Sequence, residues 1–466
     1  MLEKIISRSS IVLLALLPFH AIVVTFLNYG LNLQQFKILS LSLSSWKEIL
    51  IVLIGILTVC HSCPISKYGV NSDRNLNFLN KKIPVFTGMT IGGFAFLAFL
   101  SYCYAKPAFG ISQWVWGFRY DFFFLITFLI FSLNTFNKKE IYKLINIALF
   151  SSAIAILLGL IIFVIRPENL ILIGFRNDWS TWYPNQALAF CQKIENSDFC
   201  RLSGTFAGPN QYGAYLIVVL PLIIWKFLEK KSKFWFSIGF LALISLVLTF
   251  SRSAWIAFVT EILILLIIYI YKKYEFKINL KKFFTIFLSI IIIFLLILFP
   301  LVKFTKFQNS ILKPESTSQH FELMQNAIRI IKENSFGIGL GMAGPASYRF
   351  ENENNKAIIT ENWYLQLAVE LGIIGMILFM IILGQIIFQN LKNSLKQKEY
   401  LNENLFIALS LIGLATASIF LHNFEDSSTV LTLFTLLGIL NSPPCPRSLE
   451  REGVKKVPLF EERDLG

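Results

Sequence analysis

The sequence predicts an all-α, polytopic integral membrane protein with about twelve transmembrane helices, because apolar runs near the ~20 residues that cross a bilayer recur along it. Hydrophobic residues make up 55% of the 466 residues, and 46 residues are Phe. Only 15% of the residues are charged, against ~25% in soluble domains. A soluble protein of this size could not bury so much apolar surface, so a soluble fold is excluded.

The apolar runs give the order of the predicted spans. They lie near residues 10–28, 48–61, 84–105, 114–134, 143–165, 211–228, 234–250, 254–271, 283–302, 363–389, 404–421 and 427–441. The second and the last are short for a span. The first follows Lys4 and Arg8 but has no small-residue cleavage site after it, so we expect a retained span and not a cleaved signal peptide.

The basic residues predict the orientation. Lys and Arg concentrate in alternate short loops, which the positive-inside rule places in the cytoplasm together with both termini. Two long loops, about 166–211 and 303–362, then lie outside the cytoplasmic (inner) membrane. We expect one transmembrane domain over 1–441 and a flexible cytoplasmic tail over 442–466. The net charge of +14 reflects these loops, and no nucleic-acid partner is predicted.

The two long loops carry their own signals. Cys191 and Cys200 share the first loop, where a disulfide and free thiols are both open alternatives. In the second loop, Phe321, Met324, Ile328 and Ile331 recur at helical spacing, which predicts an amphipathic helix. That helix could lie on the outer membrane surface, or it could pack on other loop segments.

Nothing in the sequence predicts a metal or a nucleotide cofactor. Cys60 and Cys63 resemble half of a zinc site, but no second pair accompanies them. The glycines between 337 and 344 have a spacing similar to a dinucleotide fingerprint. They follow a helix-like stretch and not a strand, so we discard that interpretation.

The polar residues that could carry chemistry gather on the predicted outer side. Arg201 approaches span six, Arg252 lies in the turn after span seven, Glu361 and Asn362 precede span ten, and His422 follows span eleven. This arrangement suits a site at the membrane–water boundary. Guanidinium groups beside apolar walls favour an amphipathic anion such as a lipid-linked phosphate. The alternative is that the arginines only reach toward lipid headgroups.

Three motifs carry a resemblance to a known family. Residues 201–215 read Arg-Leu-Ser-Gly-Thr-Phe-Ala-Gly-Pro-Asn-Gln-Tyr-Gly-Ala-Tyr, and residues 249–255 read Thr-Phe-Ser-Arg-Ser-Ala-Trp. Residues 335–341 read Ser-Phe-Gly-Ile-Gly-Leu-Gly and are followed at 361–375 by Glu-Asn-Trp-Tyr-Leu-Gln-Leu-Ala-Val-Glu-Leu-Gly-Ile-Ile-Gly. Together, over about 200–440, they resemble the O-antigen ligase and O-antigen polymerase superfamily of bacterial envelope glycosyltransferases.

The resemblance implies a reaction and its partners. Such enzymes take a glycan from an undecaprenyl-diphosphate-linked donor and join it to a lipid or glycan acceptor hydroxyl at the outer face of the inner membrane. They need no nucleotide or metal. It further implies that Arg201 and Arg252 hold the diphosphate. Arg119 is a second-rank contact to the glycan or the diphosphate, and we expect no direct pair between Arg119 and Asp121, which face different sides of a helix.

The catalytic base is where this sequence departs from the ligase pattern. The ligases have a His before Asn362, and here that position is Glu361. A partly buried carboxylate can serve as the base, so Glu361 is the predicted catalytic residue, and a helix N-terminal carboxylate is the alternative. His320 and His422 are alternative bases or substrate contacts. Asn210 and Asn362 complete the predicted substrate-binding residues.

The sequence therefore predicts a metal-independent membrane glycosyltransferase that moves or polymerises a glycan from a lipid-diphosphate donor, for cell-surface polysaccharide synthesis. A transporter or flippase of lipid-linked sugars is the alternative. Such a protein would be expected to place polar residues along the middle of several spans and to contain internal repeats. The polar residues of this chain gather on one side instead.

Overall fold

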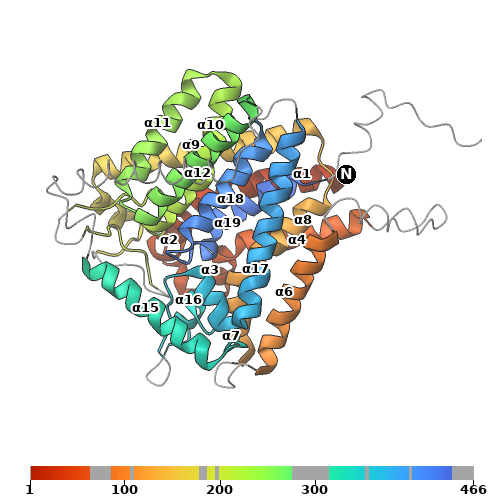
Figure 1. Cartoon of the computed structure of the whole chain (residues 1–466). Helices are drawn as coiled ribbons and strands as arrows, with labels where there is room; N and C mark the ends of the chain where they lie inside the picture. The colour runs from red at the N-terminus through yellow and green to blue at the C-terminus, as the bar shows by residue number, and fades with distance from the viewer. Residues whose placement is uncertain are drawn as a thin grey trace, which may run out of the picture.

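A computed structural model describes residues 2–62, 85–104, 110–177, 186–194, 199–274, 314–351, 356–397 and 401–442. Within these residues the fold is helical (Figure 1). Isolated bridges pair Arg176 with Ala189 and Lys193 with Cys200. The predicted all-α class is confirmed for the described chain.

The N-terminal half contains a broken series of helices followed by longer ones. The elements are α1 (Leu2–Leu16), η1 (Leu17–Phe19), α2 (His20–Thr25), η2 (Phe26–Gly30), η3 (Leu33–Gln35), α3 (Lys37–Ser44), α4 (Trp46–Ser62), α6 (Val85–Tyr104), α7 (Gly110–Asp121), α8 (Phe123–Leu133), α9 (Lys138–Ile165) and η4 (Pro167–Ile173).

The C-terminal half contains the helices that carry the sequence motifs. The elements are α10 (Pro209–Lys230), α11 (Lys233–Leu248), α12 (Arg252–Tyr274), α15 (Pro314–Glu333), α16 (Gly344–Tyr348), α17 (Trp363–Lys396), α18 (Glu403–Ala417), η5 (Asn423–Glu425) and α19 (Ser427–Leu440). Every predicted span in the described chain coincides with one or more helices. The predicted span 283–302 lies outside the described residues.

Length and composition mark a helical membrane protein. Within the described chain, 5 helical stretches are long and apolar enough to cross a bilayer: Leu2–Gly30, Lys138–Ile165, Pro209–Lys230, Arg252–Tyr271 and Trp363–Lys396. The bent pairs α3–α4 (65°) and α7–α8 (54°) raise this number to 7 if each is one span. Shorter apolar helices are Thr90–Cys103, Lys233–Leu248, Glu403–Ala417 and Ser427–Leu440.

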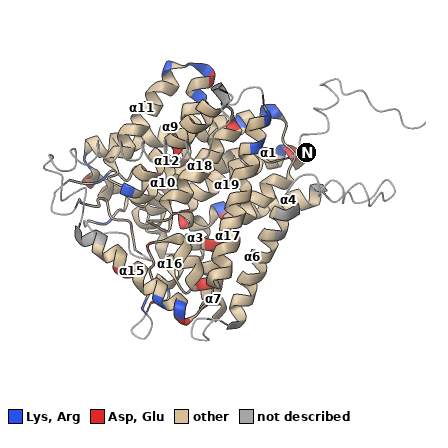
Figure 2. Ribbon diagram, in the orientation of Figure 1, with Lys and Arg blue, Asp and Glu red and all other residues tan. Residues whose placement is uncertain are grey.

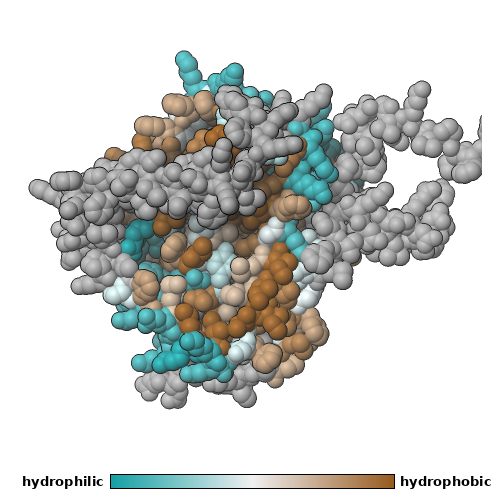
Figure 3. Space-filling view, in the orientation of Figure 1, coloured by the Kyte–Doolittle hydropathy of each residue, from teal (hydrophilic) through white to brown (hydrophobic). Residues whose placement is uncertain are grey.

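Basic residues and apolar surface each gather in particular parts of the molecule. Figure 2 shows basic residues gathered at the turn that joins α10 to α11, where Lys230, Lys231 and Lys233 lie. On the face drawn in Figure 3, an apolar surface covers the region of α17, and hydrophilic residues lie at the edge near α15. The apolar area is what lipid tails would cover.

The centre of the bundle is built around α18. This helix packs against α10, α12 and α17, while α19 packs against α8. A cluster of aromatic rings fixes the start of α17 against the turn before α19. Within it, Trp363, Phe379 and Phe424 have ring centroids 5.2–5.8 Å apart. All three side chains are fully buried, so the loops that precede α17 and α19 are held firmly at one end of the bundle.

The amphipathic helix predicted in the second long loop is present as α15, which lies across the bundle at its edge (Figure 1). It packs on α17, with Ala327 buried against Ala343 and Val369. The predicted apolar face is only partly correct, because Phe321 is 62% exposed and Ile328 is 42% exposed. Ile331 of the predicted face packs beside Ala327, as does Ile330, so the buried face is rotated from the predicted one.

The first long loop contains a disulfide between Cys191 and Cys200. The structure thus decides between the two alternatives left open by the sequence. The bridge closes the segment that leads directly to Arg201, whose backbone N–H donates to the Gln192 carbonyl at 2.9 Å. Trp179, Trp182 and Tyr183 of the same loop lie outside the described residues.

Candidate functional site

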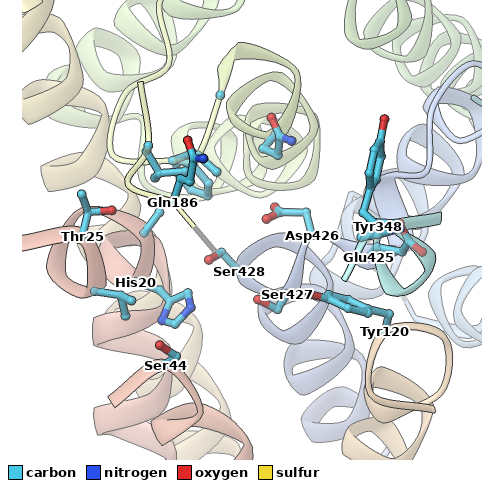
Figure 4. Close-up of a pocket in the computed structure, with 18 of the residues that line it drawn as sticks. His20, Thr25, Ser44, Tyr120, Gln186, Tyr348, Glu425, Asp426, Ser427 and Ser428 are labelled. Atoms are coloured by element: carbon cyan, nitrogen blue, oxygen red, sulfur yellow. The ribbon is translucent and has the colours of Figure 1, made fainter. Parts of the chain in front are cut away.

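A large open cavity lies where the helix breaks meet the loops that precede α10, α17 and α19. Its volume is about 1160 Å³, which exceeds the 300–1,000 Å³ typical of pockets for small ligands. Its walls come from α2 and α3, from α7, from the segments before α10 and α17, and from the turn between α18 and α19. Figure 4 shows Thr25, His20 and Ser44 on one side, and Tyr120, Tyr348 and Glu425 on the other.

The cavity brings together some of the residues predicted from the sequence. Arg119, Asn210, Glu361 and His422 line it. Arg201, Arg252, His320 and Asn362 are described residues that do not line this cavity. Of the polar residues that the sequence places on one side of the membrane, the cavity thus brings together Glu361 and His422 and leaves Arg201 and Arg252 outside its lining.

Arg201 is buried behind the wall and bonded to its own chain. Its Nε donates to the carbonyl of Thr249 at 2.8 Å, and its Nη2 donates to the carbonyl of Phe250 at 3.3 Å. The same Nη2 donates to Asn210 Oδ1 at 2.8 Å, so the guanidinium orients a side chain that does line the cavity. Burial, and then the nearby charge of Arg252, lower the pKa of Arg201 to about 10.

The turn that Arg201 holds is itself unusual. Phe250 has a φ of 49°, a conformation that a non-glycine residue adopts at some cost. The two carbonyls that accept from Arg201 flank this position, so the guanidinium stabilises the turn between α11 and α12. Arg252 is the first residue of α12 and is half-buried.

Glu361 lies at the cavity wall in a constrained conformation. Its φ is 49°, and it directly precedes Asn362, the N-cap of α17. Burial raises the pKa of Glu361 to about 7. His320 of α15 approaches it, with Nδ1 3.5 Å from Oε2. The carboxyl is therefore balanced between its acid and its base form near neutral pH, which is the range that suits a general base.

Asn362 has a structural position. Its Oδ1 accepts from the N–H of Leu365 at 2.9 Å, which caps α17, and its Nδ2 donates to the carbonyl of Ile419 at 2.7 Å. The side chain ties the start of α17 to the end of α18. It thereby fixes the backbone that carries Glu361.

His422 lies on the opposite loop, in the turn before α19. Burial, and then the charge of His320, lower the pKa of His422 to about 4. The imidazole is therefore neutral at pH 7 and can act as a hydrogen-bonding group at the wall.

The cavity brings the predicted Arg119 together with a second arginine, Arg349, that was not predicted from the sequence. The guanidinium carbon of Arg349 lies 4.0 Å from the ring centroid of Trp116, and that of Arg119 lies 4.7 Å from it. Arg349 Nε also donates to the Tyr120 hydroxyl at 3.3 Å. We call Arg119, Trp116, Tyr120 and Arg349 the cationic wall. Arg349 follows α16, in a loop with no sequence signal that could have singled it out.

The cationic wall continues through Glu48 to a buried lysine. Arg119 donates to Glu48 Oε1 from Nε at 2.8 Å and from Nη2 at 2.7 Å. Lys47 Nζ lies 3.4 Å from the same oxygen. As expected, Arg119 does not pair with Asp121, which is buried near Glu370 and Glu425. A Lys and a Glu at the start of an apolar run are the signal that could have drawn attention to this place.

Acidic residues in the turn before α19 complete the cavity. Asp426 caps α19 through Oδ2, which accepts from the N–H of Thr429 at 3.2 Å. Burial raises the pKa of Asp426 to about 6, although the bonds from Thr429 oppose the shift. Burial also raises the pKa of Glu425, whose Oε1 accepts from Gln366. Within the described residues, no group of at least three His, Cys, Asp or Glu side chains could hold a metal ion.

This geometry joins guanidinium groups, which suit phosphate oxygens, to carboxyls that titrate near neutral pH. Residues 237–380 match the family model described as O-antigen ligase. The predicted resemblance to the O-antigen ligase/polymerase superfamily is therefore confirmed. The matched segment contains Arg252, His320, Glu361 and Asn362. A comparison with curated proteins finds no match. The family indicates a glycan-transferring membrane enzyme.

Proposed function

We propose that this protein transfers a glycan from a polyprenyl-diphosphate donor to an acceptor hydroxyl at the outer face of the inner membrane. The observation that carries the proposal is the cavity itself. It combines the cationic wall with Glu361, in a helical membrane protein that matches the O-antigen ligase family. Its volume of about 1160 Å³ leaves room for a diphosphate together with sugar rings.

The donor diphosphate binds to arginines in this proposal. Arg119 and Arg349 present guanidinium groups at the cavity wall, where planar forks match phosphate oxygens. Arg201 and Arg252 lie close enough that the charge of Arg252 contributes to the lowered pKa of Arg201. An anion near this pair would relieve their repulsion. Arg201 also acts through Asn210, which it holds at the wall at 2.8 Å.

Glu361 is the proposed base. The acceptor oxygen attacks the anomeric carbon of the donor sugar, its proton passes to the Glu361 carboxylate, and the bond from that carbon to the diphosphate oxygen breaks. The lipid diphosphate leaves with the electron pair of that bond, and the arginines stabilise its charge. His320, 3.5 Å from Glu361, orients the carboxylate, and His422 contacts the substrate. The reaction requires no metal or nucleotide.

The topology completes the proposal. About twelve spans over 1–441 place both termini, including the tail 442–466, in the cytoplasm, and place the cavity at the outer surface. The placement of outer loops near 166–211 and 303–362 agrees with the disulfide at Cys191–Cys200, since disulfides persist in oxidising compartments. A cysteine introduced at position 252 should be labelled from outside in intact cells, and protection of that cysteine would contradict this topology.

The test is a reconstituted reaction. The purified chain in lipid nanodiscs is given a polyprenyl-diphosphate-linked glycan and candidate acceptors, and the products are sized. We expect a new glycosidic bond in the wild type, and its loss in Arg252→Ala and Glu361→Gln. One added glycan identifies a ligase, and a ladder identifies a polymerase. Transbilayer movement of the donor in vesicles without bond formation would overturn the proposal in favour of a flippase.

A further inference from the structure

Lys47 is a lysine that the proposed reaction does not use. It lies in the first turn of α4, its side chain is fully buried, and it belongs to the cavity wall behind His20, which is half-buried. Trp46, the preceding residue, and His20 of α2 surround it. Lysine is rarely fully buried in proteins, because removing an ammonium from water is costly. The hydrogen bonds of these three residues decide which form of the amine is present.

Trp46 determines the proton position on His20. The indole Nε1–H is a donor only, and it lies 3.1 Å from His20 Nδ1. Nδ1 must therefore be the unprotonated, accepting nitrogen of the ring. A neutral imidazole then carries its proton on Nε2. An imidazolium is excluded, because it would set an N–H on Nδ1 against the indole N–H.

His20 in turn determines the form of Lys47. His20 Nε2 lies 2.8 Å from Lys47 Nζ. Since Nε2 carries the proton, it donates, and Nζ must accept with a lone pair. An ammonium has no lone pair, so Lys47 is a neutral amine. Its two N–H groups match its two remaining partners, the Ser44 carbonyl at 3.2 Å and Glu48 Oε1 at 3.4 Å.

The surrounding charges are divided: burial and Arg119 favour the neutral amine, whereas Glu48 and Asp426 favour the ammonium. The charged or titratable groups that face Lys47 are Glu48 on its own helix, His20 on α2, Arg119 on α7, and Asp426 in the turn before α19. Glu48 is already compensated by two bonds from Arg119. Asp426 is engaged with Thr429. Both carboxylates thus accept from other donors as well, and the hydrogen bonds of Trp46 and His20 decide the form of the amine.

We propose that Lys47 is an uncharged amine in the empty protein and takes up one proton from solvent when an anionic diphosphate enters the cavity. The amine becomes an ammonium and adds a positive charge beside Arg119, with His20 turning away to release the lone pair. The inference rests on the proposed function for the identity of the anion. The neutral amine itself rests only on the hydrogen bonds of Trp46, His20 and Lys47.

The neutral amine is tested without any ligand. In protein labelled with ¹⁵N-lysine, the Nζ signal of Lys47 should appear at the amine position near pH 7, and it should be absent from Lys47→Met. Trp46→Phe frees His20 Nδ1 to carry the proton, so Nε2 can accept from an ammonium. We therefore expect that variant to show the ammonium signal instead. Only ammonium signals in the wild type would overturn the proposal.

The proton uptake is tested with farnesyl diphosphate as the probe. Titration calorimetry at about pH 8, repeated in buffers of different ionisation enthalpy, counts the protons taken up with the probe. The measurement is made in the Glu361→Gln protein, because Glu361 also titrates near this range. We expect about one proton per bound probe, and close to zero after adding Trp46→Phe, with binding retained. Unchanged uptake in Trp46→Phe and Lys47→Met would overturn the inference. Absent binding would contradict the proposed function, whereas binding without uptake contradicts only this inference.

Discussion

Two sets of residues around the cavity have opposite relations to it. Arg349 and Glu361 form the wall, whereas Arg201 and Asn362 lie behind it and bond to the chain. Arg201 and Arg349 carry the same guanidinium group. One donates to the carbonyls of Thr249 and Phe250, and the other stacks on Trp116 at the cavity surface.

A charged residue that stands out in the sequence can therefore serve the fold, as Arg201 does by bonding to Thr249, Phe250 and Asn210. A buried guanidinium with three bonds to its own chain contributes to the shape of the site, and its loss would be felt first as a loss of stability. A guanidinium stacked at a cavity surface keeps donor edges for an anion. Substitutions of Arg201 and Asn362 are therefore expected to lower stability. Substitutions of Arg349 and Glu361 are expected to change ligand binding or the rate of transfer.

The largest effect is expected from Arg201→Ala. The substitution leaves the carbonyls of Thr249 and Phe250 and the oxygen of Asn210 without their buried donor, which costs about 3–5 kcal/mol in the free energy of unfolding. Thermal unfolding in detergent measures the loss. Arg201→Lys keeps the charge without the planar fork and should recover only part of the stability. A variant that is fully stable but does not bind donor would mean that Arg201 contacts the ligand directly.

The second largest effect is expected from Glu361→Gln, which should lower the rate of glycan transfer. If Glu361 is the base, transfer should slow by about 10²–10³-fold. Because burial raises the pKa of Glu361 to about 7, the carboxyl is protonated below that pH and ionised above it. Wild-type transfer should therefore rise as the pH increases through 7. The Gln variant should show no such rise. An identical pH profile in both proteins would remove Glu361 from this role.

The fold could be predicted from the sequence more fully than the site. The helices were predictable because the bilayer thickness fixes the length of an apolar run. The helix breaks between α3 and α4 and between α7 and α8 were not, since a bent pair and a straight span contain the same apolar residues. The breaks matter, because Lys47 and Arg119 lie beside them.

The site was only partly predictable for a related reason. The motifs indicated Glu361 and Asn210, which line the cavity, but no local pattern links Arg349 to Tyr120, which are 229 residues apart. Arg201 and Arg252 stand out in sequence because charge interrupts apolar runs. An arginine within an apolar run looks the same in sequence whether its side chain faces a ligand or a backbone carbonyl. Only the fold shows which of the two it faces.

Arg349→Ala should have a smaller effect than either change above, and it should appear in binding. Losing one guanidinium from the cationic wall should weaken farnesyl diphosphate binding about 10- to 100-fold, or roughly 1.4–2.8 kcal/mol. Calorimetry measures the affinity. The unfolding temperature should stay near that of the wild type, since Arg349 is half-buried at the surface of the cavity. Unchanged affinity in Arg349→Ala would show that the diphosphate binds elsewhere. The affinity of Arg252→Ala, which removes an arginine outside the cavity lining, is the matched comparison.

The smallest effect is expected from Asn362→Ala, which completes the contrast with Glu361 one residue away. The Asn362 side chain caps α17 and bonds to the Ile419 carbonyl, so its loss should cost about 1–2 kcal/mol in the free energy of unfolding. Asn362→Ser keeps an acceptor for the cap and should cost less. Donor affinity should be unchanged in both, because Asn362 lies behind the wall. A tenfold loss of affinity in a stable Asn362→Ser protein would instead place this side chain in contact with the substrate, and the division between wall and support would then fail at this position.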